Sequence, residues 1–137
     1  MRVVIDTNVF VSSFVGGNPR KVIDLWKNGQ VTQCLSGEVL DEYTEVLRRF
    51  GLPEADLQSL LSLFARGVHI LFTSKVPRIS VVKSDPDDDK FVACAIALNA
   101  EVVITGDRAL RAVWQYQGIT IVTPEQFLRT GGFPILR

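Results

Sequence analysis

The chain has 137 residues and a mass of 15.2 kDa; 47% of its residues are hydrophobic and 22% are charged. These values suit one domain with a packed core and exclude disorder as the main state. Lysine plus arginine (15) equals aspartate plus glutamate (15), which excludes attraction of the whole molecule to nucleic acid or to an anionic membrane, so any such binding must use a local patch.

The first half of the chain alternates short apolar runs with segments of helical spacing. Ser36 provides a polar helix start and Gly51 a stop. The predicted elements are a strand at 3–5, a helix from about Asn8 that is interrupted at 16–19 and resumes around 22–26, a strand at 31–35, a helix at 36–50, a helix from 52 to about 64 and a strand at 68–72.

The second half continues this alternation after a weakly patterned stretch. The predicted elements are a short strand at 79–82, a helix opened by Asp85-Pro86 that runs to about Asn99, a strand at 102–105, a helix from 107 to about 116, a strand at 119–122 and a short helix from Pro124. The tail from Gly131 is expected to be frayed. Strands alternating with helices predict an α/β fold with a parallel sheet covered on both faces.

In such a sheet, ligands bind beyond the carboxyl ends of the strands, where the strand order reverses. Asp6 directly follows the first predicted strand, and Asp107 follows another after one glycine, so both are expected at the same edge. Asp89 lies in the first turn of the helix that precedes the second of these strands. Glu42 lies beside the apolar arc of its helix, at about 100° per residue, and is the acid of that helix nearest the interior.

Each acid also has a purely structural interpretation. Asp6 and Asp107 are suited to cap the helices that follow them. Asp85 is a good cap before Pro86, and the acids after it complement the helix dipole. Glu42 alone would more often be a surface acid than a ligand.

Together, the four acids indicate a cation-binding site. Two like charges 4 Å apart repel by about 4 kcal/mol at an effective dielectric constant of 20, so converging carboxylates either protonate or bind a cation. Oxygen-only ligands favour Mg²⁺ or Mn²⁺ over zinc. Such a site leaves positions open for water and phosphate oxygens, as phosphodiester hydrolysis requires.

Scarce residue types exclude several other chemistries. His69 is the only histidine, and Cys34 and Cys94 lie far apart within apolar runs, so they form neither a zinc motif nor a disulfide framework. The N-terminal apolar run is too short for a signal peptide, and no stretch approaches the length of a membrane span. A cytoplasmic protein without membrane contact is expected.

Five segments occur in the order typical of one family. They are Val-Val-Ile-Asp-Thr-Asn-Val-Phe at 3–10, the stretch from Ser36 through Glu42-Tyr43 to Leu47, Asp-Pro-Asp-Asp-Asp-Lys-Phe at 85–91, Val-Ile-Thr-Gly-Asp at 103–107 and Ile-Val-Thr-Pro-Glu-Gln-Phe-Leu at 121–128. This ordered set resembles a PIN domain, in particular the bacterial and archaeal toxins related to VapC. The resemblance covers residues 2 to about 129, within a single PIN-like domain expected over 1–137.

The resemblance implies a three-layer α/β/α sandwich and an endoribonuclease dependent on Mg²⁺ or Mn²⁺, with one or two ions and products that carry 5′-phosphate and 3′-hydroxyl ends. The catalytic metal-binding acids that it implies are Asp6, Glu42, Asp89 and Asp107. Asp88 and Asp85, one and four positions before Asp89, are candidates for additional ligands. Asn8 and Thr105 match supporting polar positions.

The resemblance also implies a homodimer and a small antitoxin protein that covers the site. For the RNA substrate, nearby basic residues could contact phosphates: Arg20, Lys21, Lys90, Arg108 and Arg111. Surface solvation is the alternative interpretation of each.

Three other functions compete with a nuclease. A dehalogenase-type phosphatase needs a second acid two residues after the first, where this chain has Asn8. A phospho-receiver domain needs a paired acidic start and a late lysine at a strand end, and neither is evident. A non-catalytic PIN-fold module that binds RNA or protein stays open, although clustered negative charge opposes RNA binding unless metals are present.

Overall fold

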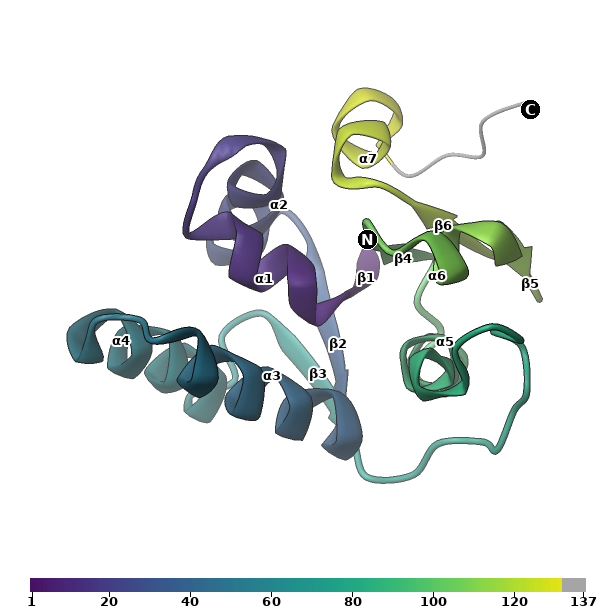
Figure 1. Cartoon of the computed structure of the whole chain (residues 1–137), viewed down its shortest axis with the longest axis horizontal. Coiled ribbons are helices and arrows are strands. Elements are labelled where there is room, and N and C mark those ends of the chain that lie inside the picture. The colour runs from purple at the N-terminus through teal and green to yellow at the C-terminus, as the bar shows by residue number, and fades with distance from the viewer. Residues whose placement is uncertain (132–137) are drawn as a thin grey trace.

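A six-stranded sheet runs through the centre of the molecule (Figure 1). The structure is a computed structural model that describes residues 1–131. In spatial order the strands are β3 (Ile70–Thr73), β2 (Thr32–Ser36), β1 (Arg2–Ile5), β4 (Val102–Ile104), β6 (Ile119–Val122) and β5 (Gln115–Tyr116). Every neighbouring pair is parallel except β5 with β6, which is antiparallel.

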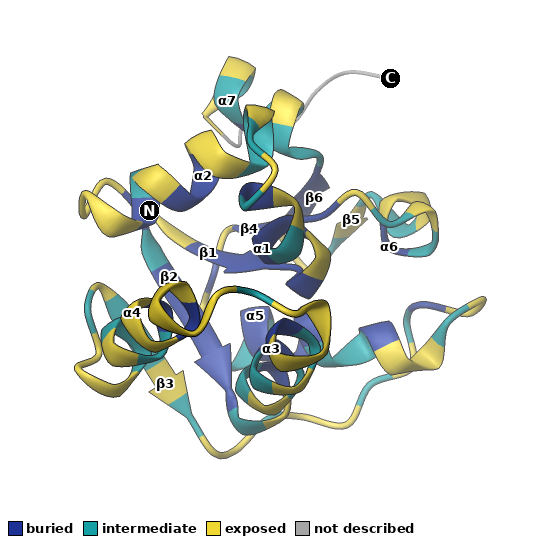
Figure 2. Ribbon diagram, turned by 60° about the vertical axis from the view of Figure 1, so that its left-hand side comes forward, coloured by how far each residue is buried: buried dark blue, intermediate teal, exposed yellow. Residues whose placement is uncertain are grey.

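Helices cover both faces of this sheet, which confirms the predicted three-layer α/β/α architecture. They are α1 (Thr7–Ser13), α2 (Gly17–Lys27), α3 (Gly37–Phe50), α4 (Glu54–Ala65), α5 (Asp89–Ala97), α6 (Arg108–Val113) and α7 (Pro124–Thr130), with a 3-10 turn, η1 (Pro86–Asp88), before α5. Buried residues concentrate in the strands and on the inner sides of the helices (Figure 2). None of the helices within residues 1–131 has the length and apolar character needed to cross a bilayer.

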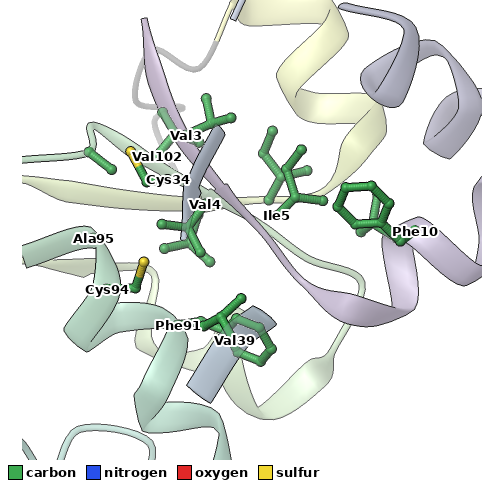
Figure 3. Close-up of a cluster of buried hydrophobic side chains, with 14 of the residues drawn as sticks. Val3, Val4, Ile5, Phe10, Cys34, Val39, Phe91, Cys94, Ala95 and Val102 are labelled. Carbon is green, nitrogen blue, oxygen red and sulfur yellow. The ribbon is translucent and has the colours of Figure 1, made fainter. Parts of the chain in front are cut away.

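The two central strands are apolar on both sides. All residues of β4, and Val3, Val4 and Ile5 of β1, are completely buried, as expected for parallel strands covered on two faces. Successive side chains of a strand point to opposite faces, so Val4 lies toward Cys94 of α5 whereas Ile5 lies toward Phe10 of α1 (Figure 3). The sheet is therefore the rigid middle layer from which the functional residues project.

Helix α3 begins and ends where the sequence predicts. Ser36 accepts a hydrogen bond from the backbone N–H of Val39, and Gly51 ends the helix in the left-handed region at φ 80°. Both cysteines are buried and free, and burial raises the pKa of the Cys34 thiol to about 11 and that of Cys94 to about 12. Both thiols therefore lie in the core, as expected for cysteines within apolar runs that form no disulfide.

Three predicted elements differ from the structure. No strand forms at 79–82, because the backbone N–H groups of Val81 and Val82 donate to the carboxylate of Asp89 instead of to a neighbouring strand. The helix predicted to run to about residue 116 ends at Val113, and the next residues form β5 through a hairpin at Gln117-Gly118, where φ is 50° and 83°. The interruption at 16–19 is shorter than expected, since α2 already begins at Gly17.

The expected fraying of the tail falls, apart from Gly131, outside the described residues.

The sheet reverses its strand order between its two central strands. β1 pairs with β2 on one side and with β4 on the other, so the chain winds outward in both directions from this pair. The carboxyl ends of β1 and β4 are the place where α/β sheets bind ligands.

Candidate metal centre

Asp6 and Asp107 stand at the carboxyl ends of β1 and β4. Asp6 accepts a hydrogen bond from the backbone N–H of Asn8 (3.2 Å), and Asp107 accepts from Ala109 N–H (2.6 Å), so both cap the following helices as their structural interpretation predicts. Their positions are also coupled. The Thr105 hydroxyl donates to Oδ2 of Asp6 (2.5 Å) and accepts from the backbone N–H of Asp107 (2.9 Å), so the completely buried Thr105 joins the two acids.

Two further acids reach the same edge from the loop before α5. Carboxylate oxygens of Asp85, Asp88 and Asp107 lie within 4.8 Å of one another. Asp85 makes no side-chain capping hydrogen bond, contrary to its predicted role, and faces these acids instead. Asp88 is 8% exposed, and its Oδ2 is buried without a hydrogen-bond partner among the described residues.

Asp89 lies outside this group, whereas the sequence interpretation placed it inside. Its Oδ1 accepts hydrogen bonds from the backbone N–H groups of Val81 (3.0 Å) and Val82 (2.8 Å), so the side chain fastens the preceding loop to α5. The physical reason is η1: this 3-10 turn ends at Asp88 and leaves that residue facing the sheet edge. The described structure therefore brings together Asp85, Asp88 and Asp107, joins Asp6 to Asp107 through Thr105, and turns Asp89 away.

A periodicity in the sequence could have identified Asp88. Residues three, four and seven positions after it are Phe91, Val92 and Ala95, all buried, so Asp88 continues the core-facing stripe of α5. Asp89 instead lies one helical turn before Ala93, and both residues line a separate surface hollow.

Glu42 faces the interior edge of α3 but has partners of its own. Its Oε2 accepts a hydrogen bond from the Thr7 hydroxyl, and its Oε1 lies 2.7 Å from the ammonium nitrogen of Lys90. The Lys90 side chain is only 10% exposed and also lies 3.2 Å from Asp87. From the sequence, Lys90 was a candidate for a phosphate contact, and this ion pair was not predicted, because it joins residues 48 positions apart.

Thr7 was missed as well. Its only signal is that it directly follows Asp6, and its contact with Glu42 forms only in the folded chain.

The acids thus form two groups, which we name by their partners. The open acidic group consists of Asp6, Asp85, Asp88 and Asp107. The paired acidic group consists of Glu42 and Asp87 with Lys90 between them. Within residues 1–131, no lysine or arginine forms an ion pair with a member of the open acidic group.

The pKa shifts of the ionisable side chains also differ between the two acidic groups. Burial, and then the charges of Asp107, Asp6 and Asp85, raise the pKa of Asp88 to about 8. Burial also raises the pKa of Asp6, more than the hydrogen bonds from Thr105 and Asn8 lower it. For Lys90, burial alone would lower the pKa of the ammonium group, but hydrogen bonds to Glu42 and Asp87 raise it above its ordinary value. Hard cations with oxygen ligands suit the open acidic group, whose carboxyl groups are buried or half-buried and have no lysine or arginine partner among the described residues.

A groove of about 590 Å³ lies beside the open acidic group. It lies between α1, the start of α2, α6 and α7, and its polar lining includes Asn8, Ser12, Asn18, Arg111 and Arg129. Asn8 thus faces this groove, with its backbone N–H on Asp6. A chain of phosphates that reached the acids along this groove would meet the guanidinium group of Arg111 and that of Arg129, which lies 3.6 Å from the carboxylate of Glu125 in the same lining.

The other basic candidates are placed differently. Arg20 donates to the carbonyl oxygens of Ser13 and Phe14 and so closes the end of α1. Lys90 is buried in its ion pairs, and Arg108 is exposed outside the groove lining. Of the basic residues considered from the sequence, Arg111 has the position that best suits a phosphate contact.

Comparison with known proteins gives three results. A family model described as "PIN domain" matches residues 2–109. The chain is 29% identical over 143 residues to the uncharacterized protein MJ1680 of Methanocaldococcus jannaschii, covering 93% of this chain and 90% of that protein. Its fold is similar to a chain in the crystal structure of VapBC2 from Rickettsia felis bound to a DNA fragment from their promoter, with a TM-score of 0.57, 16% identity, and coverage of 90% of this chain and 98% of that one.

Proposed function

The chain belongs to the PIN domain family, and from this premise we propose that it is a metal-dependent endoribonuclease that hydrolyses RNA phosphodiester bonds. One observation carries the proposal. The open acidic group crowds carboxylates at the switch point of the sheet, and Oδ2 of Asp88 is buried without a partner among the described residues. A buried polar atom in that state needs a ligand, and a divalent cation is the ligand that four carboxylates attract.

The residues proposed to hold Mg²⁺ or Mn²⁺ are Asp6, Asp88 and Asp107, with Asp85 at their side. Asp88 takes the role that sequence analysis gave to Asp89. The metal, when bound, would supply an activated water and positive charge for the phosphate and the leaving oxygen. Thr105 keeps Asp6 oriented, because its hydroxyl is fixed in turn by the backbone of Asp107.

The groove beside these acids is the proposed path of the RNA strand. Arg111 offers positive charge for phosphates, whereas Arg129 is paired with Glu125, and Asn8 offers an amide beside Asp6. His69 is no candidate for a general base, since it directly precedes β3 and therefore lies at the amino edge of the parallel sheet, opposite the acids. The acids themselves must therefore position the attacking water.

We further propose that the protein is the toxin of a type II toxin–antitoxin pair, acts in the cytoplasm as a homodimer and is blocked by a small antitoxin protein. The support is a fold shared with a solved VapBC2 assembly, together with the toxin-like motifs of the sequence. Expression of the wild-type chain should arrest growth, and expression of Asp6→Asn should not. An adjacent small reading frame that restores growth would identify the antitoxin.

The decisive experiment is cleavage of a mixed single-stranded RNA pool by the purified full chain, with Mg²⁺, with Mn²⁺ and with a chelator. Asp6→Asn and Asp107→Asn are suitable variants because asparagine caps helices about as well as aspartate, so the charge is removed while the caps persist. Metal-dependent cleavage that both variants lose is the expected result. Cleavage that survives in both would refute the site, and metal-dependent RNA binding without cleavage would indicate a binding module.

A further inference from the structure

The paired acidic group contains a cation of its own. The ammonium nitrogen of Lys90 lies 2.7 Å from Oε1 of Glu42 and 3.2 Å from Oδ2 of Asp87, and only 10% of the lysine side chain is exposed. Lysine is a compact point charge on a long stem, so a buried ammonium held by two carboxylates resembles a bound cation in charge and contacts.

Glu42 has both of its carboxylate oxygens engaged. Oε1 receives the ammonium of Lys90, and Oε2 receives the hydroxyl of the buried Thr7. A metal ion that bound Glu42 would have to displace one of these donors, and it would lie beside the lysine charge, which repels it. Asp6 and Asp107 also accept hydrogen bonds, but among the described residues no lysine or arginine pairs with the open acidic group, and Asp88 Oδ2 has no hydrogen-bond partner there.

We propose that the ammonium group of Lys90 takes the place of a second divalent cation, so that the centre binds one divalent ion per chain. The single ion binds the open acidic group, and Glu42 is a positioning residue that no ion contacts. This inference rests on the proposed metal centre, although it does not depend on RNA cleavage.

The first test counts Mn²⁺ ions bound to the metal-stripped full chain, by electron paramagnetic resonance of free Mn²⁺ and by calorimetry. Wild type should bind one ion. Lys90→Gln, which removes the charge and keeps much of the stem, should bind two, with the spectral broadening of neighbouring spins. Lys90→Arg, which keeps the charge, should bind one, as should the matched control Lys83→Gln, since Lys83 is exposed and its ammonium donates to the backbone oxygen of Ser80.

Two ions in wild type, or one ion in folded Lys90→Gln, would overturn the inference. No bound Mn²⁺ in wild type would overturn the metal centre itself, and the two failures are therefore distinguishable.

A second test keeps Lys90 intact and holds even if Lys90→Gln does not fold. Asp88→Asn should abolish detectable Mn²⁺ binding. Glu42→Gln should keep one site and weaken it by about tenfold at most, the low end for a residue that supports a ligand without touching the ion. Equal losses in the two variants would mean that Glu42 is itself a ligand, and the inference would be wrong.

Discussion

The two acidic groups at the switch point of the sheet contain the same kind of side chain under opposite conditions. In the paired acidic group a lysine ammonium lies between Glu42 and Asp87. In the open acidic group, burial and mutual repulsion raise the pKa of Asp88 to about 8. Asp87 and Asp88 are adjacent in the chain but belong to different groups, because η1 points successive side chains in different directions.

The paired acidic group stabilises the fold, whereas the open acidic group is the proposed cation-binding site. A fixed lysine neutralises carboxylates permanently and makes them part of the fold. Carboxylates left without a counter-charge destabilise the free protein and create affinity for a cation, which is how binding sites commonly differ from the rest of a structure. The predictions below test this difference by changing one group at a time.

The largest effect is expected from Asp88→Asn. Loss of a metal ligand should remove several kcal/mol of transition-state stabilisation, so RNA cleavage should fall by about a thousandfold or more. Initial rates of cleavage of one labelled RNA at saturating Mg²⁺ measure this.

The neighbouring residue provides a matched control for that prediction. Asp89→Asn removes the same charge one position away and keeps an oxygen for the backbone N–H groups of Val81 and Val82, so cleavage should change little. If Asp89→Asn abolished cleavage and Asp88→Asn did not, the assignment of the two acids would have to be reversed.

The next largest effect concerns the paired acidic group. Breaking a buried ion pair on one side destabilises a protein by roughly 3–5 kcal/mol, and because the Glu42 side chain is 23% exposed we expect about 3 kcal/mol or less for Lys90→Gln. Urea denaturation of the metal-free protein measures the free energy of unfolding.

An exposed pair on α3 serves as the reference for Lys90→Gln. Arg49 and Glu45 lie 3.9 Å apart with about 70% of each side chain exposed, so Arg49→Gln should cost about 0–1 kcal/mol. Equal losses in Arg49→Gln and Lys90→Gln would mean that the ammonium of Lys90 is no more important to the fold than a surface charge.

Asp88 of the open acidic group should make the free energy of unfolding depend on pH. The pKa of Asp88 is about 8 in the folded chain against an ordinary value of 3.8, so the folded state holds this proton more tightly. The resulting stabilisation is complete below about pH 4 and is lost as the pH rises through about 8. In the presence of chelator, the free energy of unfolding of Asp88→Asn minus that of wild type should therefore increase from pH 5 to pH 8. If this difference in free energy did not change with pH, the proposed repulsion among the carboxylates of the open acidic group would be contradicted.

Sequence patterns specified most of the fold because the strongest signals are local. Val3–Ile5 and Val102–Ile104 are continuous β-branched runs, which only a strand buried on both faces accommodates well. Helix α3 could be bounded from Ser36 and Gly51 alone. By contrast, β5 has two residues and exists only through its pairing with β6, so no local pattern could reveal it.

The positions of the proposed site residues were predictable most directly where an acid follows a strand. Asp6 and Asp107 reach the switch point because the carboxyl ends of β1 and β4 lie there. Between Asp88 and Asp89, the sequence offered only the periodicity of α5, because the three-residue 3-10 turn that orients Asp88 has no strong sequence signal of its own. The contact between Lys90 and Glu42 joins distant segments of the chain, so it forms only in the folded protein and could not be predicted from a local pattern.

The smallest effect is expected in the groove beside the open acidic group. Arg111 lines this groove, whereas Arg108, on the same short helix and also exposed, does not. In the Asp6→Asn background, which prevents cleavage, Arg111→Gln should weaken RNA binding several-fold for every sequence and lower the salt dependence by about one phosphate contact. Arg108→Gln should change neither quantity, because Arg108 does not line the groove. If Arg108→Gln had the larger effect, the RNA would have to approach the acids across the outer side of α6, and the groove would be left without its proposed role.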